Sequence, residues 1–337
     1  MMTEFQRPED HEILAAYQLC GSEKKAAKYL GISQGVFNKY HQQIKNGASP
    51  EQQRSYEMQD IPDEDISIEE ILEHKKRVFK KKKEYRDAVK YIDVNIKSNK
   101  PIGISFFGDP HIDDDGCDIE GLIRDLELCE NTDGLHAINI GDVTNNWVGR
   151  LEKLHNKQSV TLAQTYKLTE WFMGKNIWLA HCLGNHDLWN NGKYLLKSLM
   201  KKSGCSILEN DVRLRLNFPN GKQVTIHARH DFKGNSQWNS AHGVSKSAQM
   251  GNSENILVNG HTHVSGYQLV KSPTGKISHC IQLSAYKIYD SFADEMGFRD
   301  QAIFNNAITI INPKREDPVM TFFDPKEGAD YLTYLRA

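Results

Sequence analysis

The sequence predicts a layered α/β domain over residues 91–337, preceded by a small all-α domain at residues 1–47. From Tyr91 onward, short apolar runs alternate with stretches of helical periodicity. Five of these apolar runs lead directly into loops that carry Asp, His or Asn. Such alternation is typical of sheets packed with helices, which place their functional sites at the carboxyl ends of strands. Residues 11–45 show only helical spacing, in three short blocks.

The composition indicates a globular protein without a membrane span. The chain has 337 residues, of which 39% are hydrophobic, enough for a substantial core. The polar start MMTEFQRPEDHE does not resemble a signal peptide, and no run of about 18 apolar residues follows. The six cysteines show no metal-ligand spacing, which is typical of reduced thiols. We therefore expect a cytoplasmic protein that does not associate with membranes.

The first domain resembles a helix-turn-helix. Ala26, Ala27 and Leu30 are predicted to pack inward, Gly31 to allow the tight turn, and Ser33 to cap the next helix. That helix is expected to expose polar groups able to reach phosphates or base edges, namely Gln34, Asn38, Lys39, His41, Gln42 and Lys45. The net charge of −2 gives the whole chain no bias toward nucleic acid, so DNA binding requires such a local surface. The alternative is a three-helix module that binds a protein partner or a second copy of the chain.

Residues 48–90 are predicted to form a linker and a charged basic helix. The segment 46–65 is polar, contains Pro50 and Pro62, and has no periodicity. From about Ser67 the pattern indicates a long helix with a basic run, made up of Lys75, Lys76, Arg77, Lys80, Lys81, Lys82 and Lys83. Glutamates upstream can neutralise part of this run. It is either a solvated helix face or a surface that contacts the phosphate backbone of nucleic acid.

The five loops after the apolar runs carry a set of candidate metal ligands. They supply Asp109, His111, Asp142, Asn185, His186, Asp187, His230, His261 and His263. Carboxylate, imidazole and amide groups without thiolate suit divalent manganese, iron, zinc or nickel. One ion does not need so many ligands, and a carboxylate can bridge two ions. The inventory therefore predicts a two-metal centre with ions about 3.5–4 Å apart.

The order of these motifs carries a resemblance to a known family. The segments GDPHID, GDVTNN, GNHD, ARHD and GHTH follow one another between about Ile102 and His263. This order resembles the calcineurin-like metallophosphoesterases, whereas a single such motif is commonplace. The resemblance implies a layered β-sandwich flanked by helices and two divalent ions, with manganese favoured over iron, zinc or nickel.

The resemblance also implies roles for the individual residues. One ion would be held by Asp109, His111, Asp142 and His263. The other would be held by Asp142, Asn185, His230 and His261, so that Asp142 bridges the two. His186 would act on the scissile phosphate, with Asp187 orienting its ring. The nucleophile would be a metal-bound water or hydroxide.

Some residues near the motifs have competing interpretations. His227 and His230 both lie in QVTIHARHDF, and we favour His230 as the ligand because the strand is predicted to end there. His227 and His181 are expected to be ordinary strand or core residues. The aspartates 113–115 would either tune the metals or, as we favour, cap the helix that begins near Ile119 or be solvated.

Aromatic and amide side chains close to the metal-bearing loops have two interpretations each. Trp147, Trp189 and Trp238 would either stack on nucleic-acid bases or be buried against the sheet. Asn145 and Asn146 would either bond a phosphate oxygen or shape the loop.

The interpretation that uses the whole chain is a metal-dependent nuclease that hydrolyses DNA phosphodiester bonds. The helix-turn-helix and the basic helix would bring the polymer to the hydrolytic centre. The first alternative is a phosphoesterase for small nucleotides or phosphoproteins whose front domain contacts proteins. The second is a non-catalytic DNA-binding protein, which is disfavoured because no ligand is missing.

Overall fold

The structure, a computed structural model, describes residues 8–47, 65–200, 206–208, 211–251, 253–271, 275–289 and 302–337. The chain divides into two compact units, residues 1–75 and 76–337, which are described separately. The predicted linker at residues 48–64 and Cys205 lie outside the described residues. The other five cysteines are free thiols.

The first unit contains three short helices, α1 (Asp10–Cys20), α2 (Glu23–Tyr29) and α3 (Gln34–Gly47). Their shared core is made of Ile13, Ala16, Ala26, Ala27 and Phe37, all nearly inaccessible to solvent. Between α2 and α3, Gly31 has a φ of +68°, which glycine adopts without strain. The Ser33 hydroxyl accepts a hydrogen bond from the Val36 amide at 3.3 Å. The small all-α region of the predicted fold is confirmed, and its DNA-binding role stays a prediction.

One expectation for α3 is wrong. His41 does not face solvent: the residue is 2% exposed, and its Nδ1 lies 3.1 Å from Glu23 Oε1 on α2. Its ring packs 4.3 Å from that of Tyr17 and 5.5 Å from that of Phe37. The physical reason is the helical period, since position 41 lies one turn after the core residue Phe37, on the same face.

A long helix, α4 (Ile68–Ala88), follows the undescribed segment. Ser67 and Glu70 cap its start reciprocally, each side chain accepting the other's backbone amide at 3.2 Å. None of its residues is buried, and the whole predicted basic run is exposed.

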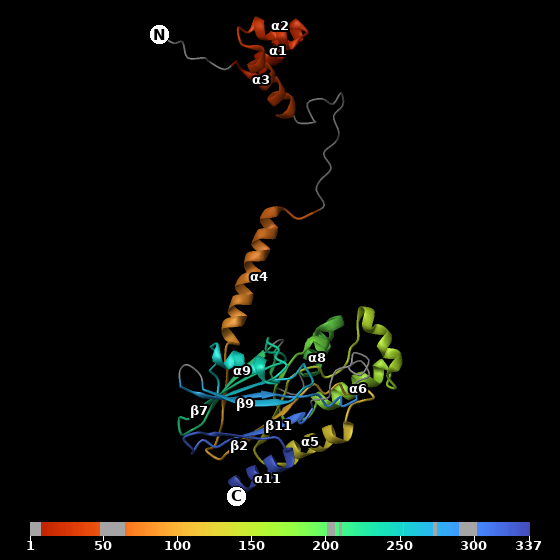
Figure 1. The fold of residues 1–337 in the computed structure, drawn as a ribbon, viewed down its shortest axis with the longest axis vertical. Coiled ribbons are helices and arrows are strands. Elements are labelled where there is room, and N and C mark those ends of the chain that lie inside the picture. Colours follow the sequence, from red (N-terminus) through yellow and green to blue (C-terminus); the bar gives the residue numbers. More distant parts are fainter. Residues whose placement is uncertain are drawn as a thin grey trace. The chain divides into compact units, whose positions relative to one another are not determined.

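The second unit is built around two sheets, each with six strands in the described part of the chain (Figure 1). The first sheet has the order β1 (Ile92–Asn95), β6 (Asp211–Asn217), β7 (Gln223–Arg229), β8 (Ile256–Asn259), β10 (Ile277–Gln282) and β9 (Gly266–Lys271). The second has the order β12 (Val319–Phe322), β11 (Asn306–Ile311), β2 (Ile102–Phe107), β3 (Leu135–Asn139), β4 (Trp178–Cys182) and β5 (Ser206–Leu208).

Helices cover the outer faces of this sandwich. Figure 1 shows α9 (His242–Gln249) over the first sheet, and α5 (Ile119–Asn131) and α11 (Pro325–Arg336) over the second. The remaining helical segments are α6 (Leu162–Met173), α7 (Asn185–Leu188), α8 (Gly192–Met200) and the 3-10 helices Gly149–Lys157 and Trp189–Asn191. The predicted layered β-sandwich flanked by helices is confirmed. Within the described residues, no helix has the length and apolar character that a membrane span requires.

The core explains why β2 is buried along its whole length, with Ser105 as its one polar side chain. Ile104 and Phe106 face the first sheet and pack in one cluster with its Leu214 and Ile226, whereas Phe107 joins the cluster beneath the helices. A strand that is covered on both faces shows a continuous apolar run. β2, β3 and β4 are parallel neighbours, as are β7 and β8, so the loops that leave their carboxyl ends share an edge.

Candidate metal centre

Every predicted ligand lies at the carboxyl end of one of these five strands. Asp109 and His111 follow β2, and Asp142 follows β3. Asn185 and His186 belong to the short helix α7 that comes after β4. His230 follows β7 directly, and His261 and His263 follow β8. The two sheets thus contribute to one site from both sides of the sandwich.

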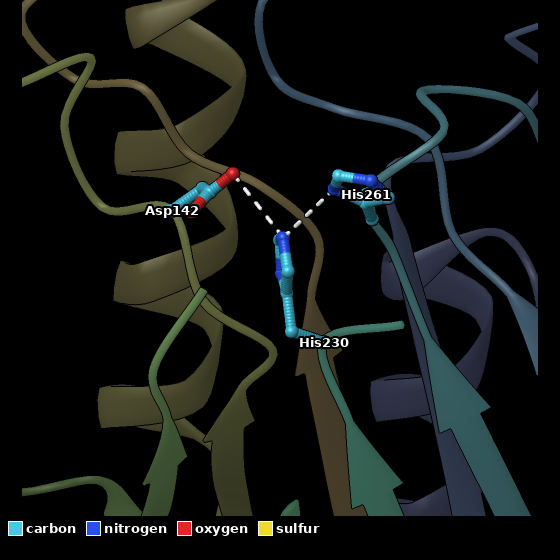
Figure 2. Close-up of side chains that lie close together, drawn as sticks. All are labelled: Asp142, His230 and His261. Atoms are coloured by element: carbon cyan, nitrogen blue, oxygen red, sulfur yellow. Dashed lines mark hydrogen bonds and ion pairs between the residues drawn. The ribbon is translucent and has the colours of Figure 1, made fainter. Parts of the chain in front are cut away.

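Three of the other predicted ligands converge on the imidazole of His230. Its Nε2 lies 3.1 Å from His261 Nδ1 and 3.2 Å from Asp142 Oδ2 (Figure 2). The same atom lies 3.0 Å from Asn185 Oδ1. Metal–ligand bonds of about 2.1 Å place neighbouring ligand atoms roughly 3 Å apart, so this spacing suits a single cation. Asp142, His230 and His261 also form a possible metal-binding group of carboxylate and imidazole side chains in the described part of the chain.

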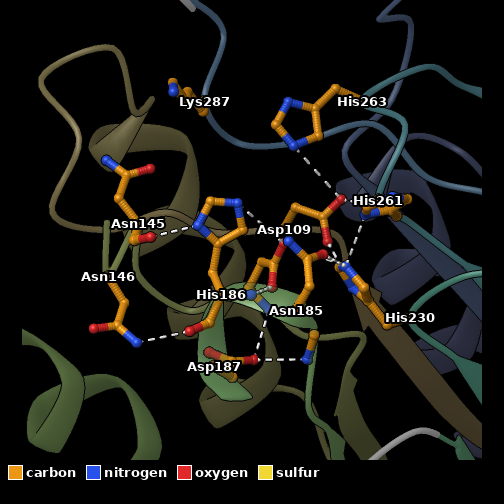
Figure 3. A network of polar contacts seen from close by, with 12 residues as sticks. Asp109, Asn145, Asn146, Asn185, His186, Asp187, His230, His261, His263 and Lys287 are labelled. Carbon is orange, nitrogen blue, oxygen red and sulfur yellow. Dashed lines mark hydrogen bonds and ion pairs between the residues drawn. The ribbon is translucent and has the colours of Figure 1, made fainter. Parts of the chain in front are cut away.

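The other predicted ligands lie beside this cluster with wider spacing. Asp109 Oδ1 is 3.4 Å from His230 Nδ1, and Asp109 Oδ2 is 3.9 Å from His263 Nε2 (Figure 3). The rings of His111 and His263 have centroids 5.2 Å apart. The structure therefore brings all seven candidate ligands into one region, tightly around His230 and more loosely around Asp109.

His111 provides a test of whether a metal ion fits here. The residue is 2% exposed, and neither of its ring nitrogens has a hydrogen-bond partner. Leaving a buried polar group unpaired costs about 1–3 kcal/mol. Burial lowers the pKa of His111 well below its ordinary value, so the ring is neutral and has a lone pair to donate. A cation would satisfy this imidazole, and the donor set of the site suits one.

The electrostatics of the site also favour a cation. Burial and the carboxylate of Asp142 raise the pKa values of Asp109 and Asp187 to about 7. Burial opposes the charged form of His230, but Asp142 and Asp109 raise the pKa of His230 to about 10. Burial also opposes ionisation of Asp142, whose pKa His230 nevertheless lowers below its ordinary value. Metal ligation needs neutral His230, so a cation would replace its proton.

The backbone of the ligand loops is strained at several of the predicted ligands themselves. Positive φ values occur at five predicted ligands, namely Asp109 (29°), His111 (42°), Asp142 (52°), His261 (72°) and His263 (54°). Among the described non-glycine residues, only Asn146 and Asn190 share this feature. Each such residue costs about 1–3 kcal/mol and persists where surrounding structure holds it, often at a functional site.

Two motif glycines allow the carboxylates to approach the backbone. A Cβ atom at Gly184 would overlap the Oδ1 atom of Asp142 and lie 2.7 Å from its Cγ. A Cβ at Gly260 would lie 2.8 Å from Asp109 Oδ2. The glycines of GNHD and GHTH are thus explained by lack of space beside two predicted ligands.

His186 lies next to the cluster with a defined orientation. Its Nδ1 contacts the backbone carbonyl of Asn145, which can only accept, so Nδ1 carries a proton. Its Nε2 is turned toward Asp142 Oδ2 at 3.9 Å. The rings of Trp147 and Trp189 flank the imidazole at 5.1 and 4.2 Å. His186 therefore presents Nε2 to the metal centre.

The predicted role of Asp187 is wrong in one respect. Its carboxylate does not orient the His186 ring; it accepts backbone amides from Asp142 at 2.7 Å, Val143 at 3.0 Å and Gly184 at 2.9 Å. Because it is buried between two ligand loops, Asp187 joins the GD motif to the GNHD motif. The carbonyl of Asn145 orients His186 instead.

The aspartates 113–115 do not cap α5, so the capping expectation is wrong, whereas Asp115 is exposed as the alternative predicted. Asp118 caps that helix by accepting the Gly121 amide at 3.0 Å. Asp113 Oδ1 accepts the Asn145 amide at 2.8 Å, and Asp114 Oδ2 accepts the Asn145 side chain at 2.7 Å. The Asp115 carboxylate accepts a hydrogen bond from the Ser159 amide at 3.1 Å.

Sequence reasoning missed Lys287. Its side chain is 5% exposed, pairs with Asp114 at 3.0 Å and lies 5.3 Å from the centre of the Trp147 ring. It belongs to none of the motifs, so no sequence signal marked it. Asn145 was considered only as a phosphate or turn residue, whereas its carbonyl is what holds His186.

The histidines that were set aside lie where expected. His227 is buried in β7 and bonds Asp211 at 2.9 Å. His181 is buried in β4, packs against Trp178 at 4.5 Å, and burial lowers its pKa to about 3. Trp238, in contrast, is 95% exposed, so its burial against the sheet is excluded.

The candidate DNA-contacting side chains form a separate set in the first unit. Gln34, Lys39, Gln42 and Lys45 on α3 are exposed, and Asn38 is half-buried. Every candidate metal ligand lies in the second unit.

Comparisons with known proteins add two structural similarities. No family model and no curated protein sequence matches the chain. The chain is similar to a single mutant of Vps29 from Entamoeba histolytica, at 12% identity over 66% of this chain and 97% of that one, with a TM-score of 0.35. It is also similar to the Pseudomonas putida nuclease MPE, at 13% identity over 65% and 87%, with a TM-score of 0.32. Similarities of this size assign no activity.

Proposed function

We propose that this protein is a divalent-metal-dependent phosphodiesterase of the calcineurin-like kind, and that its substrate is DNA. The observation that carries the proposal is the convergence of Asp142, Asn185 and His261 on His230, with His186 alongside. Carboxylate, amide and imidazole donors of this number suit two divalent ions, of which manganese is our first choice.

The site residues would have two roles: the candidate ligands would hold cations, and His186 would transfer a proton. Asp142, Asn185, His230 and His261 would hold one ion, and Asp109, His111 and His263 would hold the other with Asp142 as the bridge. When bound, such ions supply Lewis acidity: they neutralise phosphate charge and lower the pKa of water. His186 keeps Nδ1–H on the Asn145 carbonyl, so Nε2 is the atom that exchanges a proton with the departing ester oxygen.

The proposal that DNA is the substrate depends on the first unit and on α4. Helix α3 exposes four polar side chains, those of Gln34, Lys39, Gln42 and Lys45. The exposed lysine run lies on α4. These side chains can pair with phosphates or base edges. A small soluble substrate would not require either surface.

The experiment is incubation of the purified protein with Mn²⁺ and a substrate panel. The panel contains single- and double-stranded DNA, RNA, cyclic nucleotides, a phosphopeptide and methyl 4-nitrophenyl phosphate. We expect DNA hydrolysis that stops on chelation and returns with added Mn²⁺. Hydrolysis of small nucleotides or the phosphopeptide without DNA cleavage would support the alternative phosphoesterase. DNA binding without hydrolysis of any ester would support the non-catalytic alternative.

A further inference from the structure

A cavity of about 660 Å³ lies beside the metal centre. Its walls come from the loop after Asp142, the 3-10 helix Gly149–Lys157, and helices α6 and α8. None of the seven candidate metal ligands lines it. A cavity of this size is within the range of small-ligand sites, about 300–1,000 Å³.

Two residues, Trp147 and Asn146, connect this cavity to the proton-transferring histidine. Trp147 lines the cavity, and its ring is 5.1 Å from that of His186. Asn146 lines it as well, and its amide donates to the His186 carbonyl at 2.8 Å and the Trp189 carbonyl at 2.9 Å. A group in the cavity would therefore be adjacent to an ester whose phosphate lies on the metal centre.

The charge of the lining excludes the phosphate itself. Asp113, Glu152 and Asp187 line the cavity, and its described lining includes no Lys or Arg. An anionic group would find no lysine or arginine among these residues and would lie close to the exposed carboxylate of Glu152, so the lining favours an uncharged occupant. This distinguishes the cavity from the metal centre, which is where a phosphate would be attracted.

The remaining lining suits a flat group with polar edges. Trp147 and Tyr166 offer aromatic faces, and Leu195 and Leu196 add apolar surface. The side chain of Asn156 supplies donors and an acceptor. Bases stack on aromatic side chains and bond through their edges, which is how proteins recognise unpaired nucleotides.

We propose that this cavity binds the uncharged nucleoside group, base and sugar, next to the phosphate that is hydrolysed. The inference rests on the proposed phosphodiesterase activity and adds the group that the enzyme selects. It assigns Tyr166, on α6, to substrate selection without any part in metal binding.

The test compares two diesters that share a leaving group, thymidine 5′-(4-nitrophenyl phosphate) and methyl 4-nitrophenyl phosphate. With Mn²⁺ and the full chain, kcat/KM for the nucleoside ester should exceed that for the methyl ester by about tenfold or more. Tyr166→Ala should remove most of this preference by lowering kcat/KM for the nucleoside ester about tenfold, with the methyl ester unchanged. Tyr166→Phe should retain the preference, because the ring face is kept.

Tyr194→Ala is the matched control, since Tyr194 is also an exposed tyrosine, on α8, but does not line the cavity. It should leave both esters unaffected. Equal kcat/KM for the two esters in the wild type, or an equal loss for both in Tyr166→Ala, would overturn the nucleoside assignment while the phosphodiesterase proposal stands. Failure to hydrolyse either ester, or any panel substrate, would instead overturn the proposed function, and with it this inference.

Discussion

Replacement of Gly184 by alanine should damage the site without straining the backbone. Gly184 has a φ of −84°, which alanine adopts readily, so the substitution tests only the space for a Cβ atom. That atom would overlap Asp142 Oδ1 and lie 2.7 Å from Asp142 Cγ, whereas Cβ contacts essentially never fall below 3.0 Å. The carboxylate has to move by several tenths of an ångström to about 1 Å. A displacement of about 1 Å at a reacting site costs about 10²-fold in rate.

The assay is kcat/KM for methyl 4-nitrophenyl phosphate with saturating Mn²⁺, accompanied by metal analysis and the Tm. We expect a loss of about 10²-fold in kcat/KM and weaker metal binding, with a cooperative melting transition retained. Gly35→Ala is the matched control, because a Cβ at Gly35 meets nothing within 4 Å. Wild-type kcat/KM and metal content in Gly184→Ala would refute the argument that Asp142 must lie against this glycine to work.

Three further predictions concern the division of roles. Thorough chelation should abolish activity. Asp142→Asn should be among the most damaging single changes. Near-normal turnover of this variant with both metals retained would show that Asp142 is not the bridge. His186→Ala should lower turnover by about 10²-fold or more at unchanged metal content, and loss of an ion would place His186 among the ligands. A chain beginning at Asp87 should hydrolyse the methyl ester at the full rate but bind DNA more weakly, with a salt slope reduced by nearly one unit per lost phosphate contact. Unchanged DNA affinity would favour a protein-binding role for residues 11–45, and loss of ester hydrolysis would show that the removed segment, residues 1–86, helps to build the site.

The positions of the candidate metal ligands at strand ends could be predicted from sequence because each depends on a local pattern. An apolar run followed by Asp, His or Asn marks a strand end, and parallel strands bring such ends to one edge. The same local reasoning predicted the layered α/β domain and the buried Ala26 and Ala27 of the first unit, whereas the sandwich was implied by the family resemblance. It failed for His41, where the helical period outweighed the polar character of the side chain.

The role of Asp187 depends on which loops meet in three dimensions. Its carboxylate accepts amides from Asp142 and Val143, which are more than 40 residues away along the chain. No spacing rule indicates that a motif aspartate binds another motif's backbone in preference to the neighbouring histidine. The cavity beside Trp147 could not be predicted from the sequence either, because its walls come from segments between Asp113 and Leu196 that share no pattern.

The contacts that orient the His186 ring extend beyond the motifs. The Asn145 carbonyl can hold the imidazole only if residue 145 is itself fixed, and Asp113 fixes its amide while Asp114 fixes its side chain. Lys287, from beyond the last motif, pairs with the same Asp114 oxygen that accepts from Asn145. The acidic residues that follow the first motif therefore orient His186, while the motif residues form the candidate metal centre. The orientation of His186 thus depends on residues outside the candidate ligand set, and this is why the positions of the candidate ligands were easier to predict than the contacts of His186.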